Sequence, residues 1–298
     1  MGDDAVQQHV HEGKASFDHL YDLPDPRPLF RALAPLGYRI PHHGQPLFSF
    51  LLAEQRRDNG HGPLTVHRPL TVLDVCCSYG INAALLKHDL TLKDLYERYS
   101  TEELDGLSAE ELAEADRAFF AERRSSAGLR VIGLDTAGSA IGYALRAGLL
   151  DGGFGENLEH DEPSPELTGA LRAVDLITVS GGVGYLSART FDRLLAATRG
   201  RSPWVATFPL RTVDYAPIAE ALARYGLVTE HWAGRTFPQR AFVSAQERRF
   251  AVRGVRERGL DPAGKEADGE FHADFYLSRP ADDAAALPID RLLASLDA

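Results

Sequence analysis

Two acidic residues, Asp74 and Asp135, lie near the ends of two short runs of aliphatic and β-branched residues, 71–75 and 129–134. In nucleotide-binding folds, an acid at the end of the second strand accepts hydrogen bonds from the ribose hydroxyls. An acid buried at the end of the first strand needs a cation or amide donors beside it, because an unpaired buried carboxylate costs several kcal/mol. The two acids therefore suit the polar ends of one nucleotide-like ligand.

The apolar run that contains Asp74 is interrupted by a group of mostly small residues, Cys76, Cys77, Ser78, Tyr79 and Gly80. Apolar residues with helical spacing follow from Ile81, so the pattern predicts a strand, a tight turn and a helix. In an open parallel sheet, a nucleotide-like ligand lies outside the carboxyl end of the first strand. Small turn residues at that place let backbone amides approach the ligand.

A third apolar run, 173–179, ends in the small residues Ser180, Gly181 and Gly182. Two glycines where a strand opens onto a cleft suit a close approach between backbone and ligand, although an ordinary strand-to-helix turn also fits. The three runs have the lengths of buried strands and are separated by segments with helical spacing. Such an alternation predicts a parallel sheet with helices on both faces.

A loop candidate for the base of the ligand lies in the segment 149–158, where a third strand and its following loop are expected. Glu156 and Asn157 are the groups of this segment that could hydrogen-bond to a base. Because both are loop residues, a solvent-facing role fits them equally well.

With these strand ends, the chain resembles the class I S-adenosylmethionine-dependent methyltransferases. Their first motif has the form VLDxGxGxG, and residues 72–80 here read VLDVCCSYG. Cys76 and Ser78 replace two of the usual glycines, whereas Gly80 is kept. The dinucleotide fingerprint GxGxxG and the Gly-Lys-Ser/Thr ending of a phosphate loop are both absent.

The resemblance implies a Rossmann-like, doubly wound α/β sheet of about seven strands, mostly parallel. Residues 226–232 and 272–277 would form an antiparallel hairpin at its edge. The implied cofactor is S-adenosylmethionine, with Asp74 oriented toward its ammonium group directly or through water and Asp135 accepting its ribose hydroxyls. The full set of expected cofactor contacts is Asp74, Cys76, Cys77, Ser78, Tyr79, Gly80, Asp135, Thr136, Glu156, Asn157, Ser180, Gly181 and Gly182.

Methyl transfer is an in-line displacement at a carbon that positive sulfur already activates, so the protein mainly contributes alignment and exclusion of water. Candidates for a base or positioning group are Tyr79, Tyr185, His42, His43 and His231. The Tyr79 ring could lie beside the sulfonium, a cation–π contact of about 1 kcal/mol, or simply pack. No metal site is expected, since His42 and His43 cannot share one face of an extended chain and a third ligand is missing.

Residues 1–68 precede the first strand and form the expected N-terminal arm. Residues 1 to about 14 are expected to be disordered, and 16–50 are rich in proline and aromatic residues. Short helices and turns are expected there, with a longer helix over 46–57 and a polar loop at 59–63. The arm either covers the cofactor cleft as a lid or packs on the outside of the sheet.

Residues 69–298 form the expected methyltransferase-like domain, which contains an insertion. The 54 residues between Gly80 and Asp135 exceed the roughly 20 of the ordinary unit, which predicts a helical insertion over 88–128. Ser108 and Glu111 fit a capping box at the start of its second helix. Three functional interpretations of the insertion are open: it sets substrate specificity, it closes the site, or it forms a homodimer face. The alternative is a solvated helical pair without such a role. In the basic segment 233–271, Arg235 or Arg240 could hold an acidic substrate.

Composition narrows the class of partner. The chain has 298 residues, 44% of them hydrophobic and 25% charged, which is typical of a soluble globular protein. A net charge of −11 repels nucleic acid and favours a small-molecule substrate. No membrane span and no signal peptide are apparent, so a cytoplasmic location is expected. The only two cysteines are adjacent, which excludes a disulfide framework and a CxxC site.

The sequence thus predicts a S-adenosylmethionine-dependent transferase that methylates a small molecule. A second hypothesis uses the γ carbon of the same cofactor. If no acceptor enters and the α-amine attacks that carbon, the cofactor cyclises to azetidine-2-carboxylate and methylthioadenosine leaves, as in the azetidine-carboxylate synthases. A third hypothesis is a non-catalytic binding module. Hydrogen-bonding residues at every expected strand end disfavour it.

Overall fold

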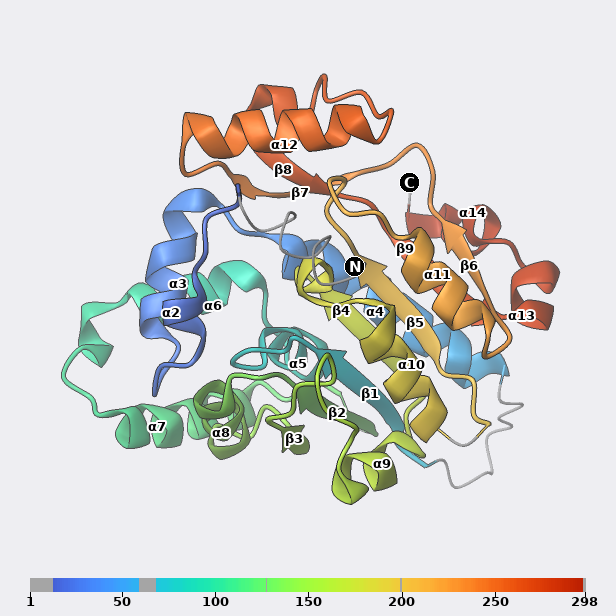
Figure 1. Cartoon of the computed structure of the whole chain (residues 1–298). Helices are drawn as coiled ribbons and strands as arrows, with labels where there is room; N and C mark the ends of the chain where they lie inside the picture. Colours follow the sequence, from blue (N-terminus) through green and yellow to red (C-terminus); the bar gives the residue numbers. More distant parts are fainter. Residues whose placement is uncertain (1–12, 59–67, 127, 199, 297–298) are drawn as a thin grey trace.

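Seven strands form a central sheet in the order β3-β2-β1-β4-β5-β9-β6, seen in the computed structural model in Figure 1. The structure describes residues 13–58, 68–126, 128–198 and 200–296. The strands are β1 (Leu70–Val75), β2 (Leu129–Leu134), β3 (Gly152–Phe154), β4 (Leu176–Ser180), β5 (Trp204–Phe208), β6 (Leu227–His231) and β9 (Tyr276–Pro280). The expected Rossmann-like doubly wound architecture is confirmed.

Strands β1 to β5 run parallel to one another, and β9 is antiparallel to both of its neighbours, β5 and β6. Consecutive residues of β1 enter opposite cores: Val72 packs in one apolar cluster and Leu73 in the other. Every residue of β1 is buried, as expected for a parallel strand with helices on both faces. The change of winding direction between β1 and β4 creates a crevice at their carboxyl ends.

The helices that follow the central strands match the sequence pattern closely. They are α5 (Ile81–Lys87), α8 (Gly138–Arg146), α9 (Pro165–Leu171), α10 (Ala188–Ala197) and α11 (Ala216–Ala223), with short 3₁₀ turns η3 (Val183–Tyr185) and η4 (Glu266–Asp268). The expected insertion contains α6 (Leu92–Ser100), η2 (Glu102–Leu104) and α7 (Ala109–Glu122). Helix α7 begins with the predicted capping box, in which Ser108 and Glu111 each bond the other's backbone amide.

The arm consists of α2 (Asp18–Tyr21), α3 (Arg27–Leu33), η1 (Ala34–Leu36) and α4 (Ile40–Asp58). The helix predicted over 46–57 therefore begins six residues earlier, and Pro46 lies inside it. Proline removes one backbone hydrogen bond, but Leu47, Phe48 and Leu51 are buried against the sheet and hold the helix together. Residues 1–12 and 59–67 lie outside the described residues, and with them the expected polar loop and most of the expected disordered terminus.

The expected strand over 272–277 is wrong as a single element. Its first part, β8 (Glu270–Ala273), pairs with β7 (Phe237–Ala241) in a separate two-stranded sheet that α12 (Ala245–Glu257) covers (Figure 1). Only β9 enters the main sheet. The break lies at Asp274, whose backbone amide bonds to the carbonyl of Pro209 and whose buried carboxylate faces Arg211. These contacts hold Asp274 at the point where the chain passes from one sheet to the other.

The C-terminal segment adds α13 (Ala281–Ala286), α14 (Ile289–Leu292) and η5 (Ala294–Leu296) along the β6 edge. Among the described residues, every helix is too short or too polar to cross a bilayer.

Candidate functional site

The carboxyl ends of β1, β2 and β4 open into a cavity of about 1100 Å³. Pockets that bind one small ligand usually measure about 300–1,000 Å³, so this cavity is large. We call its two sides the sheet wall and the arm wall. The sheet wall comes from the strand ends and their loops. The arm wall comes from the N-terminal segment, through Asp18, Tyr21, Asp22, Leu29, Leu33, Tyr38 and Pro41.

Most of the expected cofactor contacts line this cavity: Cys76, Cys77, Ser78, Asp135, Thr136, Glu156, Asn157, Ser180, Gly181 and Gly182. Tyr185 lines it too, in agreement with its choice as a candidate positioning group. Four expected site residues do not line it: Asp74, Tyr79, Gly80 and His42. The reasons differ from residue to residue.

The turn after β1 adopts a left-handed backbone at three positions, with φ of 56° at Cys76, 48° at Ser78 and 78° at Gly80. These are the positions at which the resembled motif has glycine. Left-handed backbone costs a non-glycine residue on the order of 1 kcal/mol. The turn has kept its conformation although two of its glycines are replaced, so the surrounding structure must stabilise it.

Asp135 is one source of that stabilisation. Its carboxylate accepts hydrogen bonds from the amide of Ser78 at 2.8 Å and from the amide of Ala137 at 3.0 Å. The side chain at the end of β2 therefore fixes the turn that follows β1. Each carboxylate oxygen can accept a further bond, so a ribose hydroxyl can still be bound.

Glycines on the neighbouring strands make room for the two cysteines. A Cβ atom placed at Gly182 would lie 2.4 Å from Cys76 Cβ, and one at Gly133 would lie 2.6 Å from Cys77 Sγ. Burial raises the pKa of both thiols. The cysteines therefore remain neutral and act as packing residues beside the cavity.

Asp74 is fully buried and is not among the residues that line the cavity, so of its two expected approaches to the cofactor only the indirect one is open. Its Oδ1 accepts bonds of 2.8 Å from both Asn82 and Thr178. Its Oδ2 has no partner among the described residues. Burial raises the pKa of Asp74 from 3.8 to about 7. Asn82 is an amide donor of the kind expected beside a buried carboxylate, and the Thr178 hydroxyl adds a second neutral donor.

Asn82 is the residue that connects this carboxyl group to the cavity, and sequence reasoning missed it. The Asn82 side chain donates to Asp74 and, at 2.8 Å, to Ser180 Oγ, and it lines the cavity. The available signal was a polar residue on the buried face of helix α5. Ser78 Oγ, in the turn nearby, is also buried and has no hydrogen-bond partner within the described part of the chain. Unpartnered polar atoms of this kind cost about 1–3 kcal/mol each unless a ligand satisfies them.

Glu156 and Asn157 have structural partners that limit their expected role toward a base. Both oxygens of Glu156 accept bonds from Ser164, which caps α9. The side-chain oxygen of Asn157 accepts the amide of Glu159. Both residues still line the cavity, so they shape the loop on this side and leave the Asn157 amide nitrogen as the group for a ligand.

Glu159 and Arg189 also line the cavity and were not expected. Glu159 accepts bonds from Ser187 and Thr190 in the first turn of α10, and Arg189 donates to the Glu159 carbonyl. These bonds join the loop after β3 to the helix after β4. Within the part of the chain that the structure describes, Arg189 is the only lysine or arginine that lines the cavity.

Tyr79 points away from the cavity, which overturns its expected contact with a sulfonium. Its hydroxyl bonds to the carbonyls of Leu20 and Leu23 and accepts the amide of Leu23. The ring packs edge-on against Tyr143. The partners of the Tyr79 hydroxyl belong to the arm, and no local sequence pattern indicates that the arm lies beside Tyr79. Tyr79 therefore joins the arm to the cofactor turn.

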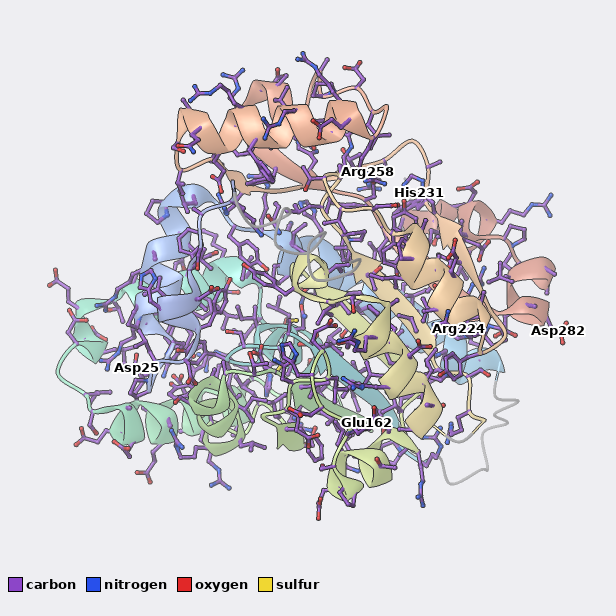
Figure 2. All side chains as sticks on the ribbon, in the orientation of Figure 1. Asp25, Glu162, Arg224, His231, Arg258 and Asp282 are labelled. Carbon is purple, nitrogen blue, oxygen red and sulfur yellow. The ribbon has the colours of Figure 1, made fainter. Side chains whose placement is uncertain are left out.

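The histidine candidates lie elsewhere. His42 is exposed on α4 and does not line the cavity. His43, beside it, has its pKa lowered to about 4 by burial. His231 lies on the edge strand β6 (Figure 2), stacked on Tyr276. Within the described chain, no group of three or more metal-ligating side chains is found.

The basic candidates also have other roles. Arg240 is buried and paired with Glu247, with a shortest distance of 2.6 Å, so it is not free for a substrate. Arg235 lies over the rings of Trp232 and Phe237. Neither arginine lines the cavity.

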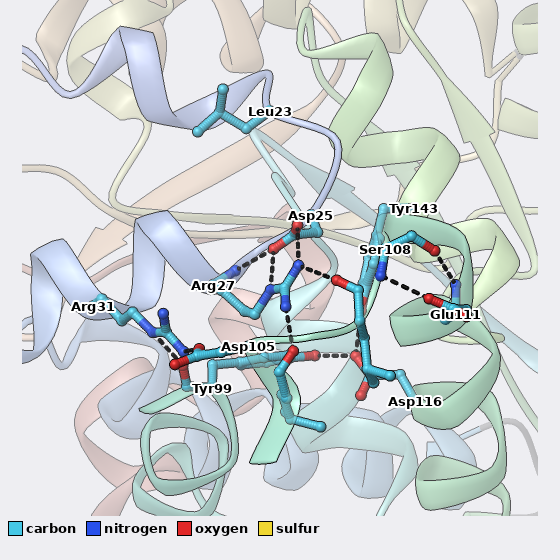
Figure 3. A network of polar contacts seen from close by, with 12 residues as sticks. Leu23, Asp25, Arg27, Arg31, Tyr99, Asp105, Ser108, Glu111, Asp116 and Tyr143 are labelled. Carbon is cyan, nitrogen blue, oxygen red and sulfur yellow. Dashed lines mark hydrogen bonds and ion pairs between the residues drawn. The ribbon is translucent and has the colours of Figure 1, made fainter. Parts of the chain in front are cut away.

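Figure 3 shows how the arm is attached to the insertion. Arg27 of α3 pairs with Asp25 and donates to the carbonyls of Leu104 and Leu107. Beneath this group, the buried Asp116 accepts bonds from Tyr99 and Tyr143 and pairs with Arg98. The arm and the insertion are therefore fixed to each other, and the arm wall is supported from behind.

No family model and no curated protein matches the sequence. Solved structures do match it. A magnesium protoporphyrin IX methyltransferase from Synechocystis, with bound S-adenosylmethionine, is 12% identical over 93% of this chain and 90% of its own, with a TM-score of 0.39. A geranyl diphosphate C-methyltransferase from Streptomyces coelicolor is 12% identical over 78% of this chain and 80% of its own, with a TM-score of 0.37.

A TehB-like methyltransferase from Corynebacterium glutamicum is 15% identical over 78% of this chain and 98% of its own, with a TM-score of 0.34. At such identities and TM-scores, the fold assignment rests on the strand order and register of the chain itself. In that order the antiparallel strand β9 lies between β5 and β6. A mostly parallel sheet of about seven strands with an antiparallel pair at its edge is what the resemblance to class I S-adenosylmethionine-dependent methyltransferases implies.

Proposed function

We propose that this protein is a S-adenosylmethionine-dependent methyltransferase that acts on a small molecule. One observation carries the proposal: Asp135 and the Asn82–Asp74 pair belong to adjacent strand ends and flank a single turn at one cavity. A carboxylate for a ribose and a polar group for an amino acid moiety are thereby available to the two ends of one adenosyl sulfonium compound.

Features of the cavity fit this cofactor. Asp74 Oδ2 and Ser78 Oγ, beside the turn, are buried polar atoms that no described residue hydrogen-bonds. Gly181 and Gly182 leave the end of β4 without side chains. The acids that line the cavity outnumber Arg189, the only lysine or arginine of its described lining. An acidic cleft with unsatisfied polar groups suits a ligand that carries a sulfonium and an ammonium group.

The residues have the following proposed roles. Asp135 accepts the ribose hydroxyls, with Thr136 beside it. Asn82 and Ser180 bind the amino acid end, and Asp74 supplies negative charge behind Asn82. The loop with Glu156 and Asn157 borders the base, and the Cys76–Gly80 turn supports the centre.

When bound, the cofactor supplies an activated methyl group. The chain's own contribution is to align an acceptor with that carbon and to keep water out. The arm, residues 1–68 in the proposed division, serves as the lid, because its described part forms one wall of the cavity and Tyr79 and Ser139 bond it to the turn and to α8. Tyr185, at the arm side, remains a candidate for positioning the acceptor.

Calorimetric titration of the purified chain with S-adenosylhomocysteine tests the proposal. Micromolar affinity is expected, and no binding at millimolar ligand would remove it. Chromatography of a reaction with S-adenosylmethionine then separates the two chemistries. S-adenosylhomocysteine that appears only when an acceptor is added supports transfer. Methylthioadenosine that appears without an acceptor supports cyclisation to azetidine-2-carboxylate and contradicts transfer.

A further inference from the structure

The arm wall of the cavity differs chemically from the sheet wall. Its apolar part comes from Leu29, Leu33 and Pro41, and its ionisable groups are the acids Asp18 and Asp22. Asp22 bonds the amide of Ser139 at the start of α8 and so anchors the arm. The Asp18 carboxylate forms no hydrogen bond or ion pair with the described residues and is exposed at the mouth. This acid is therefore free to meet a ligand.

Two phenols complete the arm wall. The hydroxyls of Tyr21 and Tyr38 have no hydrogen-bond partner among the described residues, yet neither is sealed inside the protein. The Tyr38 hydroxyl lies against the end of β4, since a Cβ at Gly181 would come within 2.5 Å of it. Burial raises the pKa of both phenols, so they stay neutral and can each donate or accept a hydrogen bond.

The only lysine or arginine of the described cavity lining, Arg189, lies on the sheet wall. Arg189 is bonded to the carbonyl of Glu159, in the loop after β3. Lys14 and Arg240, the basic residues near the arm, do not line the cavity. Lys14 lies over the rings of Tyr185 and Phe271, and Arg240 is paired with Glu247. The charges of Lys14 and Arg240 do interact with Asp18 and Tyr21, but the groups that an acceptor would touch on the arm wall are acids and neutral phenols.

We infer that the arm wall binds the acceptor, and that this acceptor is a small amine with an apolar body. The inference rests on the proposed function, because it names the substrate class of that site. The apolar body packs on Leu29, Leu33 and Pro41, and the Tyr21 and Tyr38 hydroxyls are available to its nitrogen. Asp18 attracts the ammonium form at the mouth.

The chemistry of transfer to an amine balances with the groups at hand. The ammonium first loses one proton to water at the mouth, which frees the nitrogen lone pair. That lone pair forms the new N–C bond with the methyl carbon while the C–S bond breaks, and the electron pair of the broken bond stays on sulfur. The additional proton on nitrogen passes to the Asp18 carboxylate or to water at the mouth. Anionic acceptors are excluded by repulsion rather than by shape.

Binding of three matched probes tests the inference without a catalytic readout. The chain is saturated with S-adenosylhomocysteine and titrated calorimetrically with 2-phenylethylamine, 2-phenylethanol and 3-phenylpropanoate. The amine should bind about tenfold more tightly than the carboxylate, the scale of one favourable charge contact. Equal affinities, a preference for the carboxylate, or no binding of the amine at millimolar concentration would overturn the inference.

Two variants locate the effect. Asp18→Asn should weaken binding of the amine about fivefold and leave binding of the alcohol unchanged, because only the charge is lost. Asp282→Asn removes a charge from an exposed residue of α13 at the periphery (Figure 2) and should change neither affinity. An equal loss for amine and alcohol in Asp18→Asn would contradict the proposed charge contact.

The titration with S-adenosylhomocysteine separates the two levels of the proposal. If that ligand fails to bind, the proposed function fails and this inference fails with it. If it binds and the amine shows no preference, only the acceptor class is wrong.

Discussion

The two walls of the cavity are built in different ways. The sheet wall is held by backbone geometry and buried polar groups: Asp135 bonds two amides, and Asn82 joins Asp74 to Ser180. The arm wall consists of side chains on a segment attached from outside, through Tyr79, Asp22 and the network of Figure 3. The first wall is fixed by the fold itself. The second belongs to a segment packed on the sheet, with Leu29 and Leu33 in the same apolar cluster as Val72 of β1, and its exposed Asp18 is the group proposed to meet the acceptor.

The largest expected effect of a single change belongs to the sheet wall. Asp135→Ala removes the acceptor of two amide bonds and the proposed ribose contact together. The affinity for S-adenosylhomocysteine, measured by calorimetry, should fall about a hundredfold or more, since charge-assisted hydrogen bonds contribute about 1.5–3 kcal/mol each. Asp282→Ala serves as the control. A change of less than about threefold, below 0.7 kcal/mol, would show that Asp135 does not fix the cofactor turn.

The next effect is a dependence on pH. Burial raises the pKa of Asp74 to about 7, so in the free protein the carboxyl is largely protonated below that pH. A ligand with an ammonium group favours the carboxylate. Its affinity should therefore rise with pH up to about 7, by at most tenfold per pH unit, and level off above.

The same shift has a consequence for stability. A raised pKa means that the contribution of Asp74 is complete below 3.8 and is lost as the pH rises toward 7. Asp74→Asn cannot ionise, so it should flatten both the binding profile and the fall in the free energy of unfolding across this window. Calorimetric titrations and urea unfolding at several pH values measure the two profiles. A binding profile that keeps its slope in Asp74→Asn would assign the titration to another group.

The two walls also differ in how much of their structure could be predicted from the sequence. The strand ends, the turn after β1 and the Ser108 capping box follow from short-range patterns, and the structure confirms them. The direction of a side chain depends on partners distant in sequence. Tyr79 faces away from the cavity because residues 20–23 of the arm accept its hydroxyl. No local pattern carries that information.

Two further misses have the same origin. The local sequence around Asp74 does not identify its two donors, because Asn82 comes from the following helix and Thr178 from another strand. Residues 272–277 looked like one strand because their alternation is continuous. The chain is bent at Asp274 by a contact with Arg211, which is far away in the sequence.

A third prediction concerns the packing that permits cysteines in the turn. Gly182→Ala places a methyl group 2.4 Å from Cys76 Cβ, so it should destabilise the protein by about 1–3 kcal/mol in urea unfolding. In the Cys76→Gly background the obstructing side chain is gone, and the same substitution should cost clearly less. The double-mutant cycle isolates this coupling. Additive effects of the two substitutions would mean that the two positions do not share space.

The smallest effect concerns the joint between the two walls. Tyr79→Phe keeps the ring against Tyr143 but removes the hydroxyl that bonds Leu20 and Leu23. About 1 kcal/mol of local stability should be lost. Tyr225→Phe removes a hydroxyl that bonds the Asp192 carbonyl, away from the arm, and is the matched control.

Hydrogen exchange at the Leu23 amide reports this loss directly, because that amide donates to the Tyr79 hydroxyl. Exchange there should accelerate about fivefold in Tyr79→Phe and stay unchanged in Tyr225→Phe. The affinity for S-adenosylhomocysteine should hardly change, because Asp135 and Asn82 keep the sheet wall in place. A parallel drop in that affinity would contradict the separation of the walls, since it would show that the cofactor turn depends on the arm for its shape.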